Sequence, residues 1–201
     1  HSIFVGYENE SISSKIINHA DREDGLIIVL ENTPFYSESG GQIGDTGIIK
    51  NNDFSAKVND TQKNGDYILH ICKLTRGSIG NNLSVDCIVD SDRRNSIMVN
   101  HTATHLLHQS LKDVLGSHVN QAGSLVHPEY LRFDITHPNK ISSTELDDIE
   151  IIVNQKIGED ITVKTSIKSL EEAKKEGATA LFGEKYGDKV RVVTMGEYSK
   201  E

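Results

Sequence analysis

The first 90 residues alternate between short apolar runs and polar turn clusters. The runs are rich in Ile, Val and Leu, whereas the clusters between them are rich in Asp, Asn and Gly. Short strands at near-regular spacing, separated by such turns, are typical of a small barrel or sandwich. We therefore expect strands in five segments: 12–17, 26–30, 47–49, 67–74 and 83–89.

After about residue 90 the pattern changes to helices alternating with strands. A first helix is expected from about residue 92 to 115, because Gly116 is a typical helix stop. Ser142 with Glu145 three residues later forms a capping-box pattern, and Ser169 with Glu172 repeats it, so two more helices are predicted. Strands are expected in three segments: 131–135, 161–167 and 190–195.

These elements predict an α+β protein with two domains. Residues 1–90 are expected to form a small antiparallel β-barrel. Residues 91–201 are expected to form an α+β domain whose helices pack on an antiparallel or mixed sheet. The helix after Ser142 should present one apolar face to this core, made of Leu146, Ile149, Val153 and Ile157.

Composition and charge narrow the class of protein. With 201 residues and 36% hydrophobic positions the chain can build a sizeable core, and it holds no apolar run long enough to span a membrane. Cys72 and Cys87 are too few for a disulfide framework, so a reducing, cytoplasmic compartment is expected. The net charge of −9 argues against a broad surface for DNA or other nucleic acid, although a local contact to a nucleic-acid end stays compatible with it.

Two histidines of the first helix are candidate metal ligands. His101 and His105 are four residues apart, so both rings lie on one helical face and can reach a single ion. On a helical wheel this face, which also holds His108, lies opposite the apolar stripe around Leu107, so a core role is not expected. A solvent-exposed polar face and a metal or catalytic site both stay open. A zinc protease is disfavoured, because the motif His-Thr-Ala-Thr-His lacks the Glu that serves as general base in the helical protease signature. Two protein ligands are also too few for a zinc site.

A glycine-rich stretch, residues 33–47, is the second candidate. It matches neither a Walker loop nor a dinucleotide-binding fingerprint, because no Gly-Lys-Ser/Thr follows and the glycines do not open a helix. Gly40, Gly41 and Gln42 form either a tight barrel corner or a contact at the domain junction, and we favour the junction.

Taken together, five stretches resemble the editing region of alanyl-tRNA synthetases and their free-standing relatives. They cover nearly the whole chain in order. The matching stretches are Pro-Phe-Tyr at 34–36 with Gly-Gly-Gln-x-Gly-Asp-x-Gly at 40–47, Asn-His-Thr-Ala-Thr-His-Leu-Leu-His at 100–108, His-Val-x-Gln-x-Gly-Ser-Leu at 118–125, Leu-Arg-Phe-Asp at 131–134, and Gly-Ala-x-Ala-Leu-Phe-Gly-Glu-Lys-Tyr-Gly-Asp at 177–188.

The resemblance implies a barrel followed by an editing domain that hydrolyses tRNA(Ala) wrongly charged with serine or glycine. Zn²⁺ would be held by His101 and His105 together with a later Cys-x-x-x-His, expected about two residues beyond Glu201. The second domain is therefore expected to be incomplete at its C-terminus and to bind zinc weakly or not at all. Thr104 and Gln121 match positions that line the editing pocket.

The resemblance also implies the partners. Gly40, Gly41, Gln42 and Arg132 are expected to contact the tRNA or the domain junction. The tRNA(Ala) acceptor end and the remaining domains of a parent ligase would be partners, with ATP bound only upstream of this chain and no membrane or DNA partner. Two alternatives stay open: a free-standing editing deacylase, and a non-catalytic module that grips the tRNA acceptor end.

Overall fold

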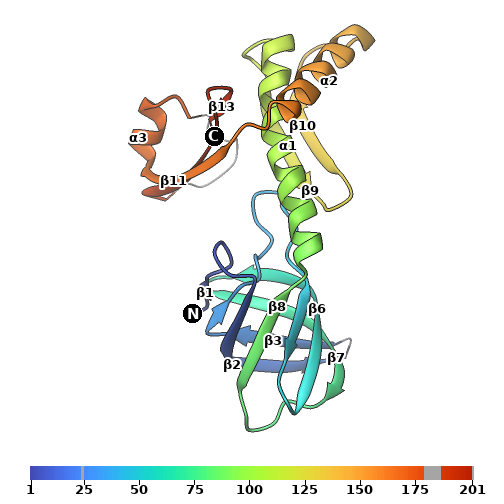
Figure 1. Cartoon of the computed structure of the whole chain (residues 1–201), viewed down its shortest axis with the longest axis vertical. Coiled ribbons are helices and arrows are strands. Elements are labelled where there is room, and N and C mark those ends of the chain that lie inside the picture. Colours follow the sequence, from blue (N-terminus) through green and yellow to red (C-terminus); the bar gives the residue numbers. More distant parts are fainter. Residues whose placement is uncertain (24, 179–186, 201) are drawn as a thin grey trace. The chain divides into compact units, whose positions relative to one another are not determined.

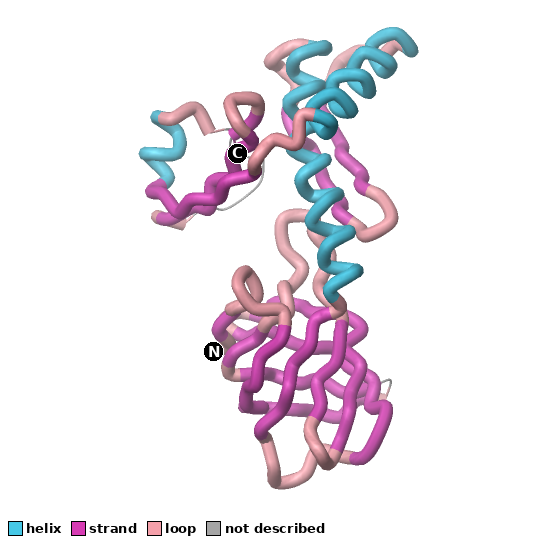
Figure 2. Tube along the Cα trace, in the orientation of Figure 1, coloured by secondary structure: helices cyan, strands magenta, loops and turns pink. Residues whose placement is uncertain are grey.

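A computed structural model describes residues 1–23, 25–178 and 187–200. The chain forms two compact units, His1–Met98 with His127–Glu129, and Val99–Val126 with Tyr130–Glu201. Strands make up most of the first unit, whereas helices and strands alternate in the second (Figure 2). The predicted α+β class is confirmed.

The first unit is built on a closed six-stranded barrel (Figure 1). Its strand order is β2-β3-β7-β6-β5-β8, and every neighbouring pair is antiparallel, as predicted. A short parallel pair, β1 with β4, accompanies it. The strands are β1 Ile3–Phe4, β2 Ser11–Arg22, β3 Gly25–Leu30, β4 Asn32–Thr33, β5 Gly47–Lys50, β6 Phe54–Asn64, β7 Tyr67–Gly77 and β8 Ser84–Val89.

Alternating side chains fill the barrel, because successive residues of a strand point to opposite faces. Strand β6 shows this most clearly: Phe54, Ala56 and Val58 are fully buried, whereas Lys57 between them is exposed. The sequence analysis missed β6, since only three of its eleven residues are buried hydrophobic ones. It also made β2 too short, because the polar end of that strand is recruited by pairing with β3.

The second unit contains two small antiparallel sheets and three helices. Helix α1 begins in the first unit and continues into the second. Strands β9 and β10 form a hairpin, and β11, β12 and β13 form the other sheet. The bounds are α1 Ser91–Leu115, β9 Asn120–Val126, β10 Leu131–Thr136, α2 Ser143–Gly158, β11 Val163–Ser169, α3 Leu170–Lys175, β12 Lys189–Met195 and β13 Ser199–Lys200.

Both predicted capping boxes are present. The Ser142 hydroxyl accepts from the Glu145 amide while the Glu145 carboxylate accepts from the Ser142 amide, and Ser169 with Glu172 repeats this arrangement. Each box satisfies backbone N–H groups that the first helical turn leaves without intrahelical partners.

The predicted apolar face of α2 is only partly correct. Ile149 is buried with Leu111 and Val119, and Val153 packs against this cluster. Leu146 and Ile157, however, keep 51% and 55% of their surface exposed. The apolar residues packed around Ile149 come from α1, the hairpin and the segments beside them, and this small cluster covers only the middle of the α2 face.

No helix in the described part of the chain is long and apolar enough to cross a membrane.

The last of the five resembling stretches, 177–188, lies mostly outside the described residues, which omit 179–186.

Candidate functional site

The two candidate metal ligands meet on α1. The rings of His101 and His105 stack with their centroids 5.1 Å apart and an interplanar angle of 18°. His101 is half-buried, and His105 is 8% exposed. The i, i+4 spacing therefore brings both imidazoles together, as the sequence predicted.

The structure corrects the expected environment of this face. His108 is only 2% exposed, and its ring packs 5.1 Å from the Phe133 ring on β10. Leu111 on the apolar stripe is also buried. The prediction assumed that α1 buries only its apolar face. In the structure the histidine face is buried as well, at His105 and His108. A solvent-exposed histidine face is therefore excluded for His105 and His108.

Two uncharged polar side chains are the candidate substrate-binding residues of the second unit. The Thr104 hydroxyl donates to the Asn100 carbonyl oxygen, 2.8 Å away, so its only proton is used but its oxygen can still accept. Gln121 is half-buried on β9 at a register shift opposite Ile135. No other described residue forms a hydrogen bond with the side-chain amide of Gln121. This side chain can therefore both donate to a ligand and accept from it.

Arg132, the candidate tRNA contact on β10, is engaged on the surface. Its guanidinium lies 3.1 Å from Asp134 Oδ2, and the two side chains are 62% and 44% exposed. Such an exposed pair is weak, so Arg132 can exchange this contact for another anion at little cost.

The described residues do not complete a zinc site. Zinc takes three or four protein ligands, of which His101 and His105 would supply two. Among the described residues there is no group of three or more His, Cys, Asp and Glu side chains arranged to hold a metal.

The glycine-rich loop contains a two-residue turn. Ser39 and Gln42 exchange two backbone hydrogen bonds of 3.1 and 3.0 Å across Gly40 and Gly41. Both glycines have positive φ, 59° and 82°, which matches a type I′ turn and strongly favours glycine. Gln42 is 6% exposed, so it is a buried residue of the barrel unit.

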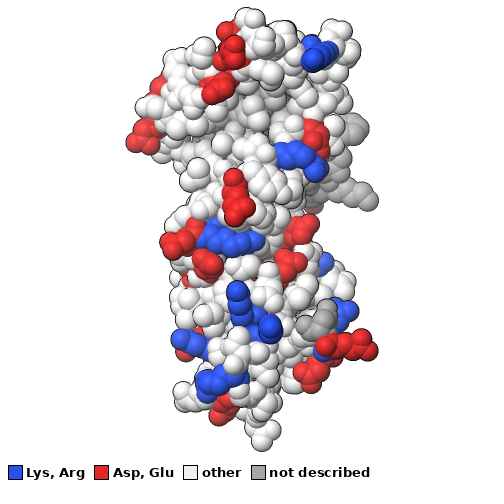
Figure 3. Space-filling view, turned by 90° about the vertical axis from the view of Figure 1, so that its right-hand side faces the viewer, with Lys and Arg blue, Asp and Glu red and all other residues white. Residues whose placement is uncertain are grey.

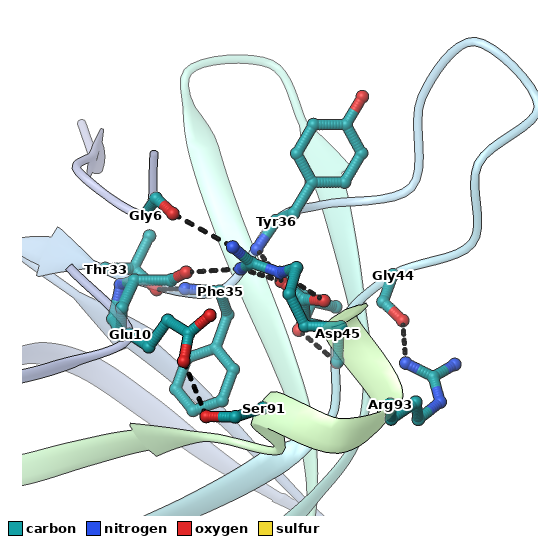
Figure 4. A network of polar contacts seen from close by, with 12 residues as sticks. Gly6, Glu10, Thr33, Phe35, Tyr36, Gly44, Asp45, Ser91 and Arg93 are labelled. Carbon is teal, nitrogen blue, oxygen red and sulfur yellow. Dashed lines mark hydrogen bonds and ion pairs between the residues drawn. The ribbon is translucent and has the colours of Figure 1, made fainter. Parts of the chain in front are cut away.

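The same loop carries a buried charge that the sequence analysis did not single out. Asp45 is 1% exposed and forms an ion pair with Arg94, whose Nε donates to both carboxylate oxygens at 3.0 and 2.9 Å. The Arg94 guanidinium also donates to the Gly6 and Pro34 carbonyls, 2.9 Å each. This network fixes the first turn of α1 to the barrel unit (Figure 4).

Neighbouring contacts strengthen the attachment. Arg93 donates to the Gly44 carbonyl at 2.8 Å, and the Ser91 hydroxyl donates to Glu10 at 2.6 Å. Asp45 and Arg94 are 49 residues apart, and an Asp in a glycine-rich loop is ordinarily a turn residue, so sequence reasoning had no signal for their pairing.

A second buried polar group lies inside the barrel. His70 Nδ1 lies 2.9 Å from the Ile28 carbonyl oxygen, and Nε2 lies 2.7 Å from the Thr33 hydroxyl. Because a carbonyl only accepts, Nδ1 carries the proton and Nε2 accepts from Thr33. Burial lowers the pKa of His70 to about 4, so the ring is neutral near pH 7.

The face drawn in Figure 3 carries charged side chains of both signs. On the face shown in Figure 3, basic and acidic side chains are interspersed among larger uncharged areas. A nucleic acid that contacts this face would therefore meet individual side chains instead of a broad basic surface.

Comparisons with known proteins support the alanyl-tRNA synthetase part of the sequence resemblance. Residues 2–93 match the family described as tRNA synthetases class II (A). The whole chain is 51% identical to part of the alanine–tRNA ligase of Oceanobacillus iheyensis, covering 24% of that protein. It is 49% identical to that of Haemophilus influenzae, with 97% of the chain and 22% of the relative aligned. The chain thus spans about a quarter of the length of these curated relatives. Over its entire length it is homologous to a portion of alanine–tRNA ligase.

Proposed function

We propose that this chain carries the proofreading site of an alanine–tRNA ligase, which hydrolyses the ester of tRNA(Ala) charged with serine or glycine. The observation that carries the proposal is the 51% identity to an alanine–tRNA ligase over the whole chain. It is supported by the presence of Thr104, Gln121, His101 and His105 in one compact unit.

The need for such a site follows from the limits of selective binding. A pocket shaped for alanine excludes larger side chains by size, but it gains little discrimination against glycine. It also rejects serine poorly, because serine adds only a hydroxyl group. A second site that hydrolyses the wrong ester corrects both errors.

The polar side chains suit recognition of the mischarged amino acid. The Thr104 oxygen can accept from the amino group or from the serine hydroxyl, since its own proton is donated to the Asn100 carbonyl oxygen. The Gln121 amide can donate to an oxygen and accept from an N–H. In the hydrolysis, water adds to the ester carbonyl and the ester C–O bond breaks. The tRNA leaves as its free hydroxyl, which takes one proton of the water, and the amino acid leaves as its carboxylate, with the other proton released to solvent.

The proposal is tested by hydrolysis of Ser-tRNA(Ala), measured on this chain and on the parent ligase. Gln121→Ala and Thr104→Val each remove one hydrogen-bonding group and are expected to lower kcat/KM about 3- to 10-fold. The matched controls Gln155→Ala and Thr144→Val, on exposed positions of α2, should leave it unchanged. Wild-type rates in both site variants of the parent would contradict the assignment.

One observation favours a second function for the isolated chain. The described residues offer two histidines but no third ligand arranged around a metal, and a module that only binds the tRNA acceptor end needs none. Measuring tRNA(Ala) binding and Ser-tRNA(Ala) hydrolysis on the same preparation separates the two. Binding without hydrolysis, when the parent ligase hydrolyses the ester, supports the binding module.

A further inference from the structure

The first unit contains a pocket that has not yet been described. Its volume is about 630 Å³, within the roughly 300–1,000 Å³ range of ligand sites. Three separate segments line it: the N-terminal segment, the beginning of the glycine-rich loop, and the β6–β7 turn. Its lining includes the side chains of Phe4, Tyr7, Tyr36, Ser37, Lys63 and Asp66.

One wall of the pocket is aromatic. The Phe4 ring meets Tyr7 and Tyr36 edge-on, with centroid distances of 4.9 and 5.8 Å. Tyr7 is 62% exposed, although burial of aromatic rings is favourable. Rings held in this way offer apolar surface on which a flat ligand can stack.

The aromatic wall is fixed by the buried ion pair. The Tyr36 amide donates to Asp45 Oδ2 at 2.6 Å, and the Asp45 amide donates to the Tyr36 carbonyl at 2.9 Å. Figure 4 shows the Tyr36 ring directed away from the network around Asp45. Phe4 lies on β1, which pairs with β4. A ligand therefore meets rings whose backbone is already ordered, which lowers the entropic cost of binding.

Charged and polar groups complete the pocket. Lys63 and Asp66 are exposed, and neither side chain has an ion pair or hydrogen bond with another described residue. Lys63 can contact a phosphate, and Asp66 can accept from an amino or hydroxyl group. Ser37 adds a hydroxyl that can donate or accept.

We propose that this pocket binds one unpaired nucleotide of an RNA end, with the base stacked on Tyr36 and the phosphate at Lys63. A flat base, a sugar with hydroxyls and a single phosphate match the aromatic wall, Asp66 and Lys63 in turn. The choice of RNA rests on the proposed function, which brings a tRNA to this chain.

Stacking, not charge, provides most of the affinity. Residues 1–90 hold 7 Lys and Arg against 13 Asp and Glu, a net charge of −6. In the proposed complex, Lys63 is the basic side chain that contacts the phosphate. Binding that releases counterions at one phosphate has a log K against log salt slope of only about −0.7 for a single strand. A surface that recognised RNA through many cations would show a far steeper slope.

The test uses the chain with ¹³C-labelled tyrosine rings, titrated with the tetraribonucleotide ACCA and followed by NMR. The ring signals of Tyr7 and Tyr36 should shift, whereas those of Tyr130 and Tyr198 in the second unit should not. Uniform shifts, or shifts only at Tyr130 and Tyr198, overturn the assignment.

Variants give the energetic test by calorimetry. Tyr36→Leu, which keeps an apolar side chain, should weaken ACCA binding about 5- to 150-fold, while Tyr36→Phe should bind like the wild type. Lys63→Gln should flatten the salt dependence, and Lys57→Gln, an exposed lysine of β6 that does not line the pocket, should not. Wild-type affinity in Tyr36→Leu together with an unchanged salt slope in Lys63→Gln contradicts the proposal.

The outcome is separable from that of the proofreading assay. Tyrosine shifts without Ser-tRNA(Ala) hydrolysis by the parent ligase would support the pocket and contradict the proposed function. Hydrolysis of Ser-tRNA(Ala) by the parent without any shift of the tyrosine signals would support the proposed function and contradict the pocket.

Discussion

At the scale of single residues, two buried polar networks govern the stability of the barrel unit. One surrounds His70 and responds to pH, and the other surrounds Asp45 and responds to substitution of Arg94. The neutral His70 ring is needed by both of its partners, the Ile28 carbonyl and the Thr33 hydroxyl. Protonation places a charge in the core and removes the acceptor that Thr33 uses. Stability should therefore depend on pH through this ring.

We expect the barrel to lose stability below neutral pH. The pKa of His70 is about 4 in the folded chain and 6.5 when unperturbed, so the unfolded chain binds more protons between these values. Stability is full above about pH 6.5 and falls as the pH drops toward 4. His70 should contribute a loss of about 2 kcal/mol between pH 7.5 and 5. Urea denaturation at both pH values measures it. His70→Gln should lack this component, whereas His19→Gln, on an exposed position of β2, should retain it.

The Asp45–Arg94 pair should be far more important than a surface pair. Arg94→Met keeps an apolar stem but leaves the Asp45 carboxylate buried without its cation, and such a loss typically costs about 3–5 kcal/mol. Arg132→Met, which breaks the exposed pair with Asp134, should cost less than about 1 kcal/mol. Chemical denaturation of both variants provides the comparison. Similar small losses would contradict a stabilising role for the buried pair.

At the scale of elements, what the sequence could predict follows from how local each signal is. The helix starts at Ser142 and Ser169 depend on contacts within four residues, and both were predicted correctly. Strands β6 and β9 contain few strong apolar residues and exist because a neighbouring strand pairs with them, so neither was found. The pairing of His101 with His105 was local and predictable. The burial of His108 depends on Phe133 from another element, so it could not be predicted from the local sequence.

The capping box of α2 gives a prediction at this scale. Ser142→Ala removes the acceptor for the Glu145 amide and should lower stability by about 1 kcal/mol. Ser143→Ala, one residue later on an exposed position of the same helix, should stay within about 0.5 kcal/mol of the wild type. Amide hydrogen exchange within α2 locates the effect. Equal protection in the two variants would show that the cap contributes nothing.

At the scale of the whole molecule, the arrangement of the described histidines gives an expectation for zinc binding. We expect no tight one-to-one zinc site, because His101 and His105 supply two nitrogen ligands and the described residues contain no group of three or more potential ligands arranged around a metal. Titration of the chain with zinc at pH 7.5 measures this. Tight binding that His101→Ala abolishes and His118→Ala does not would reveal a ligand within these 201 residues that we have missed.

The attachment of Arg94 has a practical consequence for anyone who divides this protein into smaller pieces. The change in sequence pattern near residue 90 suggests a cut there, but the compact unit continues to Met98. A piece that ended at residue 90 would keep the Asp45 carboxylate in the interior and discard the guanidinium that neutralises it. A piece that ended after Met98 would retain both, together with the buried Ile97. The first two turns of α1 should therefore be kept with the barrel in any shortened form of this chain.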